Sequence, residues 1–201
     1  MSKYEDLFSA AARESRARGH DVPDRTATPN MDLGVQHEAS LVELLLDWVG
    51  NPPPISRIAG QCALINASLL HRVASLFDVA PAYTIGSVIG NAGSTLFSCS
   101  WEEIDRWAQH DLATRLRSRA PFHVWLTLPH AQIVDFTFEA SCAVAGELGQ
   151  FGVIARPANA IKGFRYVPVA VGNDLPKRVL IPIQELPNLI TRNFRRSLKI
   201  F

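Results

Sequence analysis

Apolar residues return at helical spacing along the stretch from Cys62 to Phe77. They fall on one side of a helix, which is the pattern of a helix that buries one face. The apolar positions are Cys62, Ile65, Leu69, Val73 and Leu76. The pattern therefore predicts a buried helix that carries a cysteine in its first turn, directly after Gly60 and Gln61.

Helical spacing also marks five other stretches. They cover residues 4–18, 40–49, 100–119, 137–148 and 183–199. Ser40 and Ser100 each stand three residues before a glutamate, which is the capping-box spacing at the start of a helix. Prolines and glycines in residues 19–34, and three consecutive prolines at 52–54, predict loops between the first helices.

Runs of β-branched and aromatic residues predict short strands. These runs cover residues 82–89, 94–99, 122–128, 132–136, 163–171 and 178–182. Turn sequences at 90–93 and 129–130 join neighbouring runs into hairpins. Hairpin-connected strands with helices at both ends predict an α+β fold. We expect one domain, residues 1–201, because the helices of the N-terminal extension, residues 1–54, are too small to fold alone.

Composition is typical of a globular protein with a core. Of the 201 residues 47% are hydrophobic, and the mean hydropathy is +0.06. A formal net charge of +1 gives no overall attraction to nucleic acid or to anionic membranes, and no apolar run approaches the roughly 20 residues that span a bilayer. Residues 1–6 lack the layout of a signal peptide, so we expect a cytoplasmic protein without nucleic-acid or membrane partners.

The chain has three cysteines, Cys62, Cys99 and Cys142. An odd number without a secretion signal argues against a disulfide framework, and no C-x-x-C pair or histidine–carboxylate cluster has metal-ligand spacing. We therefore expect neither a metal nor a cofactor. Cys99 and Cys142 stand in apolar contexts typical of core residues. Cys62 is the chemical candidate, because unpaired N–H groups at a helix start favour the thiolate form.

A cysteine nucleophile needs a base, and His123 is the best-placed histidine. Alternate residues of a strand share a face, so His123 and Trp125 point the same way from residues 122–128. Asp135 is the only carboxylate in the apolar strand 132–136, and hairpin pairing would bring it near His123. Because a buried carboxylate is costly without a partner, we expect Asp135 to bind and orient His123.

Four segments resemble the transglutaminase-like core of the papain-like cysteine enzymes. Gly60-Gln61-Cys62 and its helix are followed by a short break, the pair Pro81-Ala82 and a strand, in the order of that core. Phe122-His123-Val124-Trp125 resembles its His-Ala-Trp strand, and Val134-Asp135-Phe136-Thr137 resembles its Asp-Pro-Thr strand. The resemblance covers residues 60–138, which is under half of the chain.

The resemblance implies a papain-like fold in which the cysteine helix packs on an antiparallel sheet. Cys62 would be the nucleophile, His123 the base and Asp135 the residue that orients the base. Val124 and Phe136 depart from the family's small residue and proline, both conservatively for a strand. Arylamine N-acetyltransferases and papain-like peptidases share this triad, so the implied function is a cysteine-dependent hydrolase or acyl or amide transferase. Its substrate would be an amide, ester or thioester of a small molecule or peptide.

Several positions leave alternatives open. Gln61 either helps to bind an oxyanion beside the Cys62 N–H or faces solvent, and Trp125 is either a pocket wall or a core residue. The helix at 100–119 either restricts access to the site as a lid or lies away from it. The basic side of the last helix is either a solvated face or a surface for an acidic partner. A chain that kept the fold without the chemistry would be a non-catalytic binding module. The sequence predicts no oligomeric state.

Overall fold

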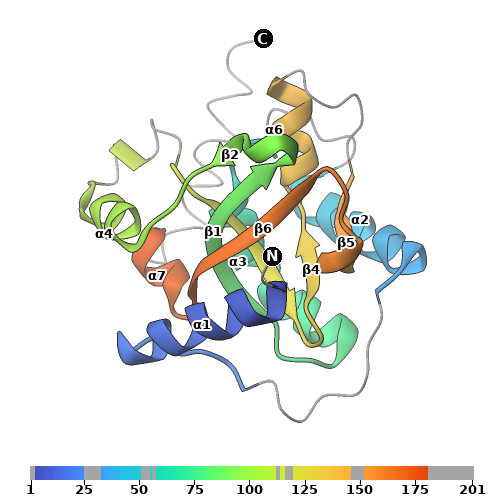
Figure 1. Cartoon of the computed structure of the whole chain (residues 1–201). Helices are drawn as coiled ribbons and strands as arrows, with labels where there is room; N and C mark the ends of the chain where they lie inside the picture. Colours follow the sequence, from blue (N-terminus) through green and yellow to red (C-terminus); the bar gives the residue numbers. More distant parts are fainter. Residues whose placement is uncertain are drawn as a thin grey trace.

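The computed structural model describes residues 3–24, 33–50, 55, 58–111, 114–115, 120–145 and 152–180. Within them six α-helices lie around a six-stranded antiparallel sheet (Figure 1). The helices are α1 (Tyr4–Ala17), α2 (Val35–Val49), α3 (Cys62–Phe77), α4 (Trp101–Gln109), α6 (Phe138–Ala145) and α7 (Leu175–Val179). The strands are β1 (Ala82–Gly90), β2 (Thr95–Phe97), β3 (His123–Leu128), β4 (Gln132–Asp135), β5 (Ile154–Pro157) and β6 (Phe164–Val171). This architecture confirms the α+β prediction.

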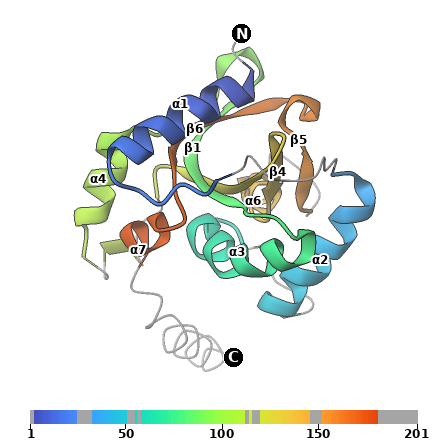
Figure 2. The ribbon, with the colours of Figure 1, turned by 90° about the horizontal axis from the view of Figure 1, so that it is seen from below.

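The strand β1 is central and pairs along both of its edges. One edge carries β6 over residues 84–90, and the other carries β3 over residues 82–86 and then β2 at residues 88–89. The sheet continues from β3 through β4 to β5. In Figure 2 the sheet is curved, with α2 and α3 on one side and α1 on the other. The two sides of β3 therefore belong to different environments.

Alternation along β3 divides the core as the sequence predicts. Phe122, Val124 and Leu126 are fully buried in the cluster that includes the buried face of α3. Trp125 belongs to a second cluster on the other face, with Tyr166. His123 shares the face of Trp125, because successive side chains of a strand alternate. The side chain of His123, the candidate base, thus leaves β3 on the face opposite to the one that packs on α3.

Gly86 lets three segments approach one another closely. It lies opposite His123 in β3, at an irregularity in the pairing of β1 with β6. A Cβ atom at Gly86 would lie 2.1 Å from the carbonyl oxygen of Val167 and 2.8 Å from the ring of Trp125. Only glycine fits, because the closest atom belongs to the backbone of β6 and cannot swing aside.

The N-terminal helices are tied into the same packed unit. The Val171 backbone N–H donates to the hydroxyl of Ser15 at 2.9 Å, which fixes α1 on β6. The hydroxyl of Tyr4 lies 2.6 Å from the Thr127 hydroxyl of β3. The helix α2 packs against α3 and β5.

The start of α2 corrects one helix prediction. The helix begins at Val35 rather than at Ser40, and the ring nitrogen Nδ1 of His37 accepts a hydrogen bond from the Gly34 N–H at 3.1 Å. A histidine therefore caps this helix, which a capping-box pattern does not include. The second capping box is confirmed in part, since the Glu103 N–H donates to the Ser100 hydroxyl at 3.3 Å.

The end of the described chain corrects another prediction. Residues 178 and 179 end the helix α7, so the strand predicted at 178–182 is wrong there. Pro176 in the first turn favours a helix start, because its missing N–H would be unpaired anyway. The strand β5 was not predicted. The helix predicted at 100–119 ends at Gln109, and the helix predicted at 183–199 lies outside the described residues.

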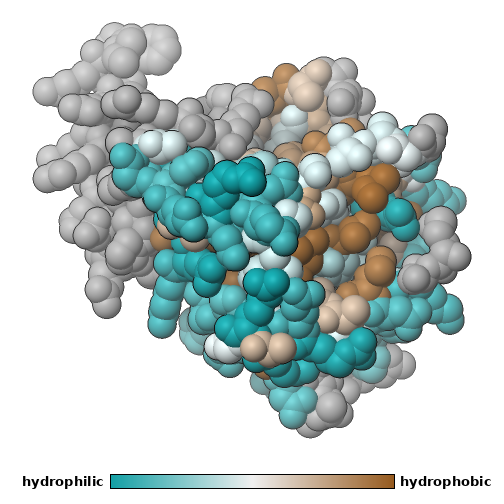
Figure 3. All heavy atoms as spheres, turned by 60° about the vertical axis from the view of Figure 1, so that its left-hand side comes forward, coloured by the Kyte–Doolittle hydropathy of each residue, from teal (hydrophilic) through white to brown (hydrophobic). Residues whose placement is uncertain are grey.

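Few large apolar side chains are exposed on the described surface. Hydrophilic residues cover most of the described face in Figure 3, and hydrophobic ones gather in one region to the right of centre. The large hydrophobic side chains exposed in the described part are Ile55, Leu76 and Val144. Leu76 is 44% exposed, so its predicted place in the buried stripe of α3 is wrong, whereas the polar Asn66 is buried in that stripe.

Candidate active site

Cys62 is the first residue of α3 and is buried at the end of the helix that faces β3. Its side chain is 5% exposed, and its thiol donates a hydrogen bond to the Phe122 carbonyl oxygen with Sγ 3.9 Å away. The loop before it is held by α6, because the Gly60 N–H donates to the Ser141 hydroxyl at 3.3 Å. The first N–H groups of a helix have no partner within it, so their positive end lies beside the sulfur.

A split between β3 and β4 lets Cys62 approach the face that carries His123. The two strands pair from Leu128 with Gln132 back to Leu126 with Val134, but β3 continues to His123 without β4 beside it. Asn66 fills the gap, and its Nδ2 donates to the Val124 carbonyl at 3.0 Å and to the Cys62 carbonyl at 2.9 Å. The side chain thus takes the place of the missing strand and joins α3 to β3.

His123 and Asp135 form a buried pair. Nε2 of His123 lies 2.5 Å from Oδ2 of Asp135, and each residue is 1% exposed. The other carboxylate oxygen, Oδ1, accepts the Thr137 N–H at 2.9 Å, the Thr137 hydroxyl at 3.2 Å and the Phe138 N–H at 3.1 Å. The Tyr166 hydroxyl donates to Oδ2 at 2.8 Å. Asp135 therefore holds the imidazole and also caps the start of α6.

These contacts set the charges of the pair. Burial by itself raises the pKa of Asp135, but the charge and hydrogen bond of His123, with the Thr137 amide and the Tyr166 hydroxyl, bring it below its ordinary value. Burial by itself lowers the pKa of His123, but Asp135 and then Cys62 raise it to about 10. Burial and Asp135 raise the pKa of Tyr166, which keeps its hydroxyl a donor. The contacts therefore keep Asp135 a carboxylate and stabilise the positive charge that His123 takes on with a proton.

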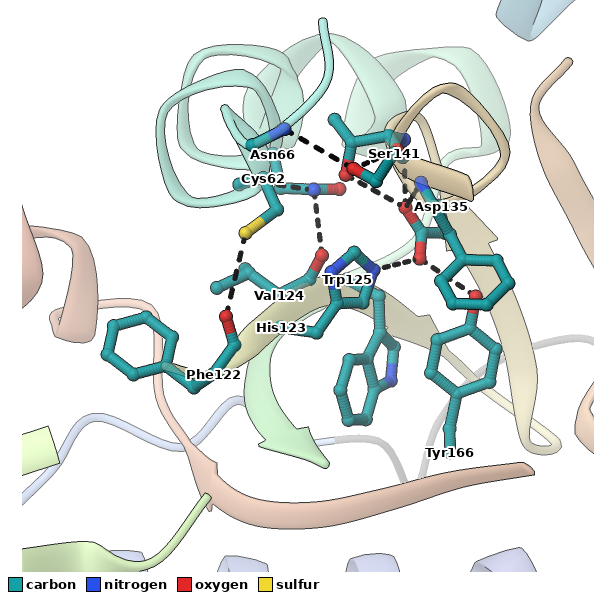
Figure 4. A network of polar contacts seen from close by, with 12 residues as sticks. Cys62, Asn66, Phe122, His123, Val124, Trp125, Asp135, Ser141 and Tyr166 are labelled. Carbon is teal, nitrogen blue, oxygen red and sulfur yellow. Dashed lines mark hydrogen bonds and ion pairs between the residues drawn. The ribbon is translucent and has the colours of Figure 1, made fainter. Parts of the chain in front are cut away.

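The second ring nitrogen of His123, Nδ1, is left open toward Cys62. It has no hydrogen-bond partner among the described residues. Cys62 nevertheless contributes, after Asp135, to the raised pKa of His123, so the thiol and the imidazole interact. Figure 4 shows Cys62 and Asp135 on opposite sides of the ring. Proton transfer from the thiol to Nδ1 requires Cys62 to give up the Phe122 carbonyl.

The two predicted oxyanion or substrate-binding residues, Gln61 and Trp125, lie in different settings. Gln61 is exposed and makes no side-chain capping bond at the start of α3. Trp125 is fully buried, and its indole N–H donates to the hydroxyls of Tyr4 at 2.8 Å and Thr127 at 3.1 Å. Its ring stacks on His123 with centroids 6.2 Å apart. Trp125 therefore supports the histidine from behind, as a core residue.

Sequence reasoning missed Asn66, Tyr166 and Ser141. Asn66 had a usable signal, since it is a polar residue one turn after Cys62 on the apolar side of the helix. Tyr166 and Ser141 had none, because the first is 31 residues from Asp135 and the second 81 residues from Gly60. Of the other two cysteines, Cys142 is buried in α6, and burial followed by Glu103 raises the pKa of the Cys99 thiol.

A cavity of about 960 Å³ is lined in part by Tyr166. Its described lining comes from the start of α1, the β3–β4 turn and the start of β6, and it includes Tyr4, His130, Phe164, Arg165 and Tyr166. Cys62, His123 and Asp135 are not among these lining residues. Tyr166 therefore lines the cavity and also donates a hydrogen bond to Asp135.

The described residues contain no group of three or more histidine, cysteine, aspartate or glutamate side chains that could hold a metal ion. In that same part of the chain no helix combines the length and apolarity needed to cross a membrane. Comparison with protein-family models, with curated proteins and with solved structures gave no match to this chain.

Proposed function

We propose that this chain is a cysteine-dependent hydrolase or acyl or amide transferase with a papain-like, transglutaminase-like fold. The observation that carries the proposal is the imidazole of His123, which Asp135 holds at Nε2 while Nδ1 stays open on the side of Cys62. The packing of α3 against an antiparallel sheet supports the same assignment. Its substrate is an amide, ester or thioester of a small molecule or peptide.

The chemistry follows from the order of the three groups. His123 takes the Cys62 proton at Nδ1, and the sulfur attacks the carbonyl carbon of the substrate. Backbone N–H groups at the start of α3 stabilise the negative oxygen that forms. The proton then passes from Nδ1 to the leaving group as its bond breaks, which leaves an acyl group on Cys62. Asp135 keeps the ring oriented and stabilises its positive charge.

Alkylation kinetics test this proposal. We expect iodoacetamide to label Cys62 at pH 6 at least about tenfold faster than Cys99 and Cys142, because a thiolate beside an imidazolium persists where free thiols are protonated. Peptide mass spectrometry resolves the three sites. The variant His123→Gln is the control and should remove the advantage of Cys62. Equal labelling of all three cysteines in the unaltered protein would contradict the proposal.

Burial of the site favours a second candidate, a non-catalytic binding module. The exposed fractions of Cys62, His123 and Asp135 are 5%, 1% and 1%. In a module of this kind the three residues only stabilise the fold as buried core groups. It predicts slow labelling of Cys62 and full biological activity of a Cys62→Ala protein, both opposite to the enzyme proposal.

A further inference from the structure

Two neighbouring polar atoms of the site are buried without a partner. In the described part of the chain, four buried side-chain nitrogen or oxygen atoms lack a hydrogen bond, and two of them are Oδ1 of Asn66 and Nδ1 of His123. Asn66 is bonded to Val124, the residue next to His123, and to Cys62. Figure 4 shows the Asn66 carboxamide and the His123 ring next to each other, between Cys62 and Asp135.

The orientation of Asn66 is fixed by its bonds. Nδ2 donates to two carbonyl oxygens, so a flipped carboxamide would set Oδ1 against both of them. Oδ1 is therefore the free atom, and it can only accept. A buried acceptor without a partner is destabilising, so such an atom in a folded protein calls for an occupant.

The state of His123 changes during the proposed reaction. Once the leaving group has taken its proton, the ring is neutral, and the hydrogen on Nε2 is donated to Asp135. Nδ1 is then an acceptor. At that stage Oδ1 of Asn66 and Nδ1 of His123 are two acceptors beside an acylated Cys62, and a partner that satisfies both must bring two hydrogens.

We infer that Asn66 and His123 together hold the group that removes the acyl chain from Cys62. This inference rests on the proposed function. The oxygen or nitrogen of the incoming group forms a bond to the acyl carbon, one of its hydrogens moves to Nδ1, and the C–S bond breaks with its electron pair returning to sulfur. The second hydrogen stays bonded to Oδ1. Water and primary amines carry two hydrogens, whereas alcohols carry one, so Asn66 favours the first two.

The test uses p-nitrophenyl acetate with the full chain, because release of p-nitrophenol separates acylation from deacylation. The burst gives the acylation rate, and the later steady rate gives deacylation. Asn66→Leu removes both the link to β3 and the acceptor Oδ1. Ser141→Ala, which loosens the loop before Cys62, is the control for general loss of order.

We expect Asn66→Leu to slow deacylation about tenfold more than it slows acylation, the value of one hydrogen bond to a reacting group. Ser141→Ala should leave the ratio of the two rates within about twofold of the unaltered protein. Equal slowing of both steps by Asn66→Leu would reduce Asn66 to a structural link and overturn the inference. A normal burst with unchanged deacylation in Asn66→Leu would overturn it as well.

If the proposed function is wrong, the unaltered protein gives no burst of p-nitrophenol, and both proposals fall.

If Asn66→Leu does not fold, competition between two acyl acceptors in the unaltered protein decides. Hydroxylamine brings two N–H hydrogens and methanol brings one O–H hydrogen. We expect hydroxylamine to be favoured over methanol at least about tenfold more strongly on the enzyme than with an acetyl thioester in solution. An equal preference in the two cases would overturn the inference.

Discussion

The hydroxyl of Tyr166 offers a direct test of how Asp135 is held. Tyr166→Phe removes one donor to Oδ2, the same oxygen that faces His123, and changes no other atom of the site. A hydrogen bond to a charged group contributes about 1.5–3 kcal/mol. We therefore expect the free energy of unfolding to fall by about that amount at pH 7, with the melting temperature lower by roughly 3–12 °C.

Tyr83→Phe is the matched control for this measurement. Tyr83 is also fully buried, but its hydroxyl donates to a neutral acceptor, the Ala63 carbonyl, at 3.0 Å. Loss of that bond should cost only about 0.5–1.5 kcal/mol. Urea titrations of the two variants and the unaltered protein give the comparison. Equal losses in the two variants would refute the view that Tyr166 acts on a carboxylate.

The pH dependence adds a second check. The pKa of Asp135 is below its ordinary value of 3.8 in the folded protein, so the stability that it contributes is complete above about pH 4. That stability is lost as pH falls through the folded-state pKa, where the carboxylate becomes protonated. The gap between Tyr166→Phe and the unaltered protein should therefore narrow below pH 4, while the effect of Tyr83→Phe stays constant. A gap that widens in acid would contradict this assignment of charge.

Three backbone positions give further predictions. Gly86→Ala should lower the free energy of unfolding by about 3 kcal/mol or more, because the new methyl group meets the Val167 backbone. Gly90→Ala should lower it less, since its methyl group meets the movable Ser94 hydroxyl, and urea denaturation that ranks the two variants in the opposite order would be inconsistent with the packing. Ala131→Gly should raise the free energy of unfolding by about 0.5–1 kcal/mol, because Ala131 has a φ of +56° in the β3–β4 turn. A loss of stability in Ala131→Gly would show that the turn is not strained.

The sequence was most informative where a local pattern is sufficient. The strands β3 and β4 follow from alternating buried residues and a turn, and their ends lie within one residue of the prediction. Cys62, His123 and Asp135 each stood out as a chemically active residue within an apolar element. The contact between His123 and Asp135 depends on a hairpin, which is a short-range feature. These properties made the pair of His123 and Asp135 predictable.

The missed features depend on contacts between distant segments. Tyr166 lies in the strand that the sequence predicted, but its approach to Asp135 depends on the curvature of the whole sheet. Asn66 finds its partner only because β4 leaves β3 early, and no local pattern fixes where two strands separate. The start of α2 depends on a bond from a histidine side chain to the backbone, which the common capping pattern does not contain.

The double use of Asp135 has a consequence for how relatives of this protein would evolve. Its carboxylate caps α6 and accepts the Tyr166 hydroxyl, so selection for a stable fold would keep it even in a descendant that had lost its activity. His123 would be kept with it, because an unpaired buried carboxylate is costly. Cys62 has no such protection, since its thiol makes one weak bond to a backbone carbonyl. Under the proposed function, the identity of the residue at position 62 would therefore separate active relatives from inactive ones.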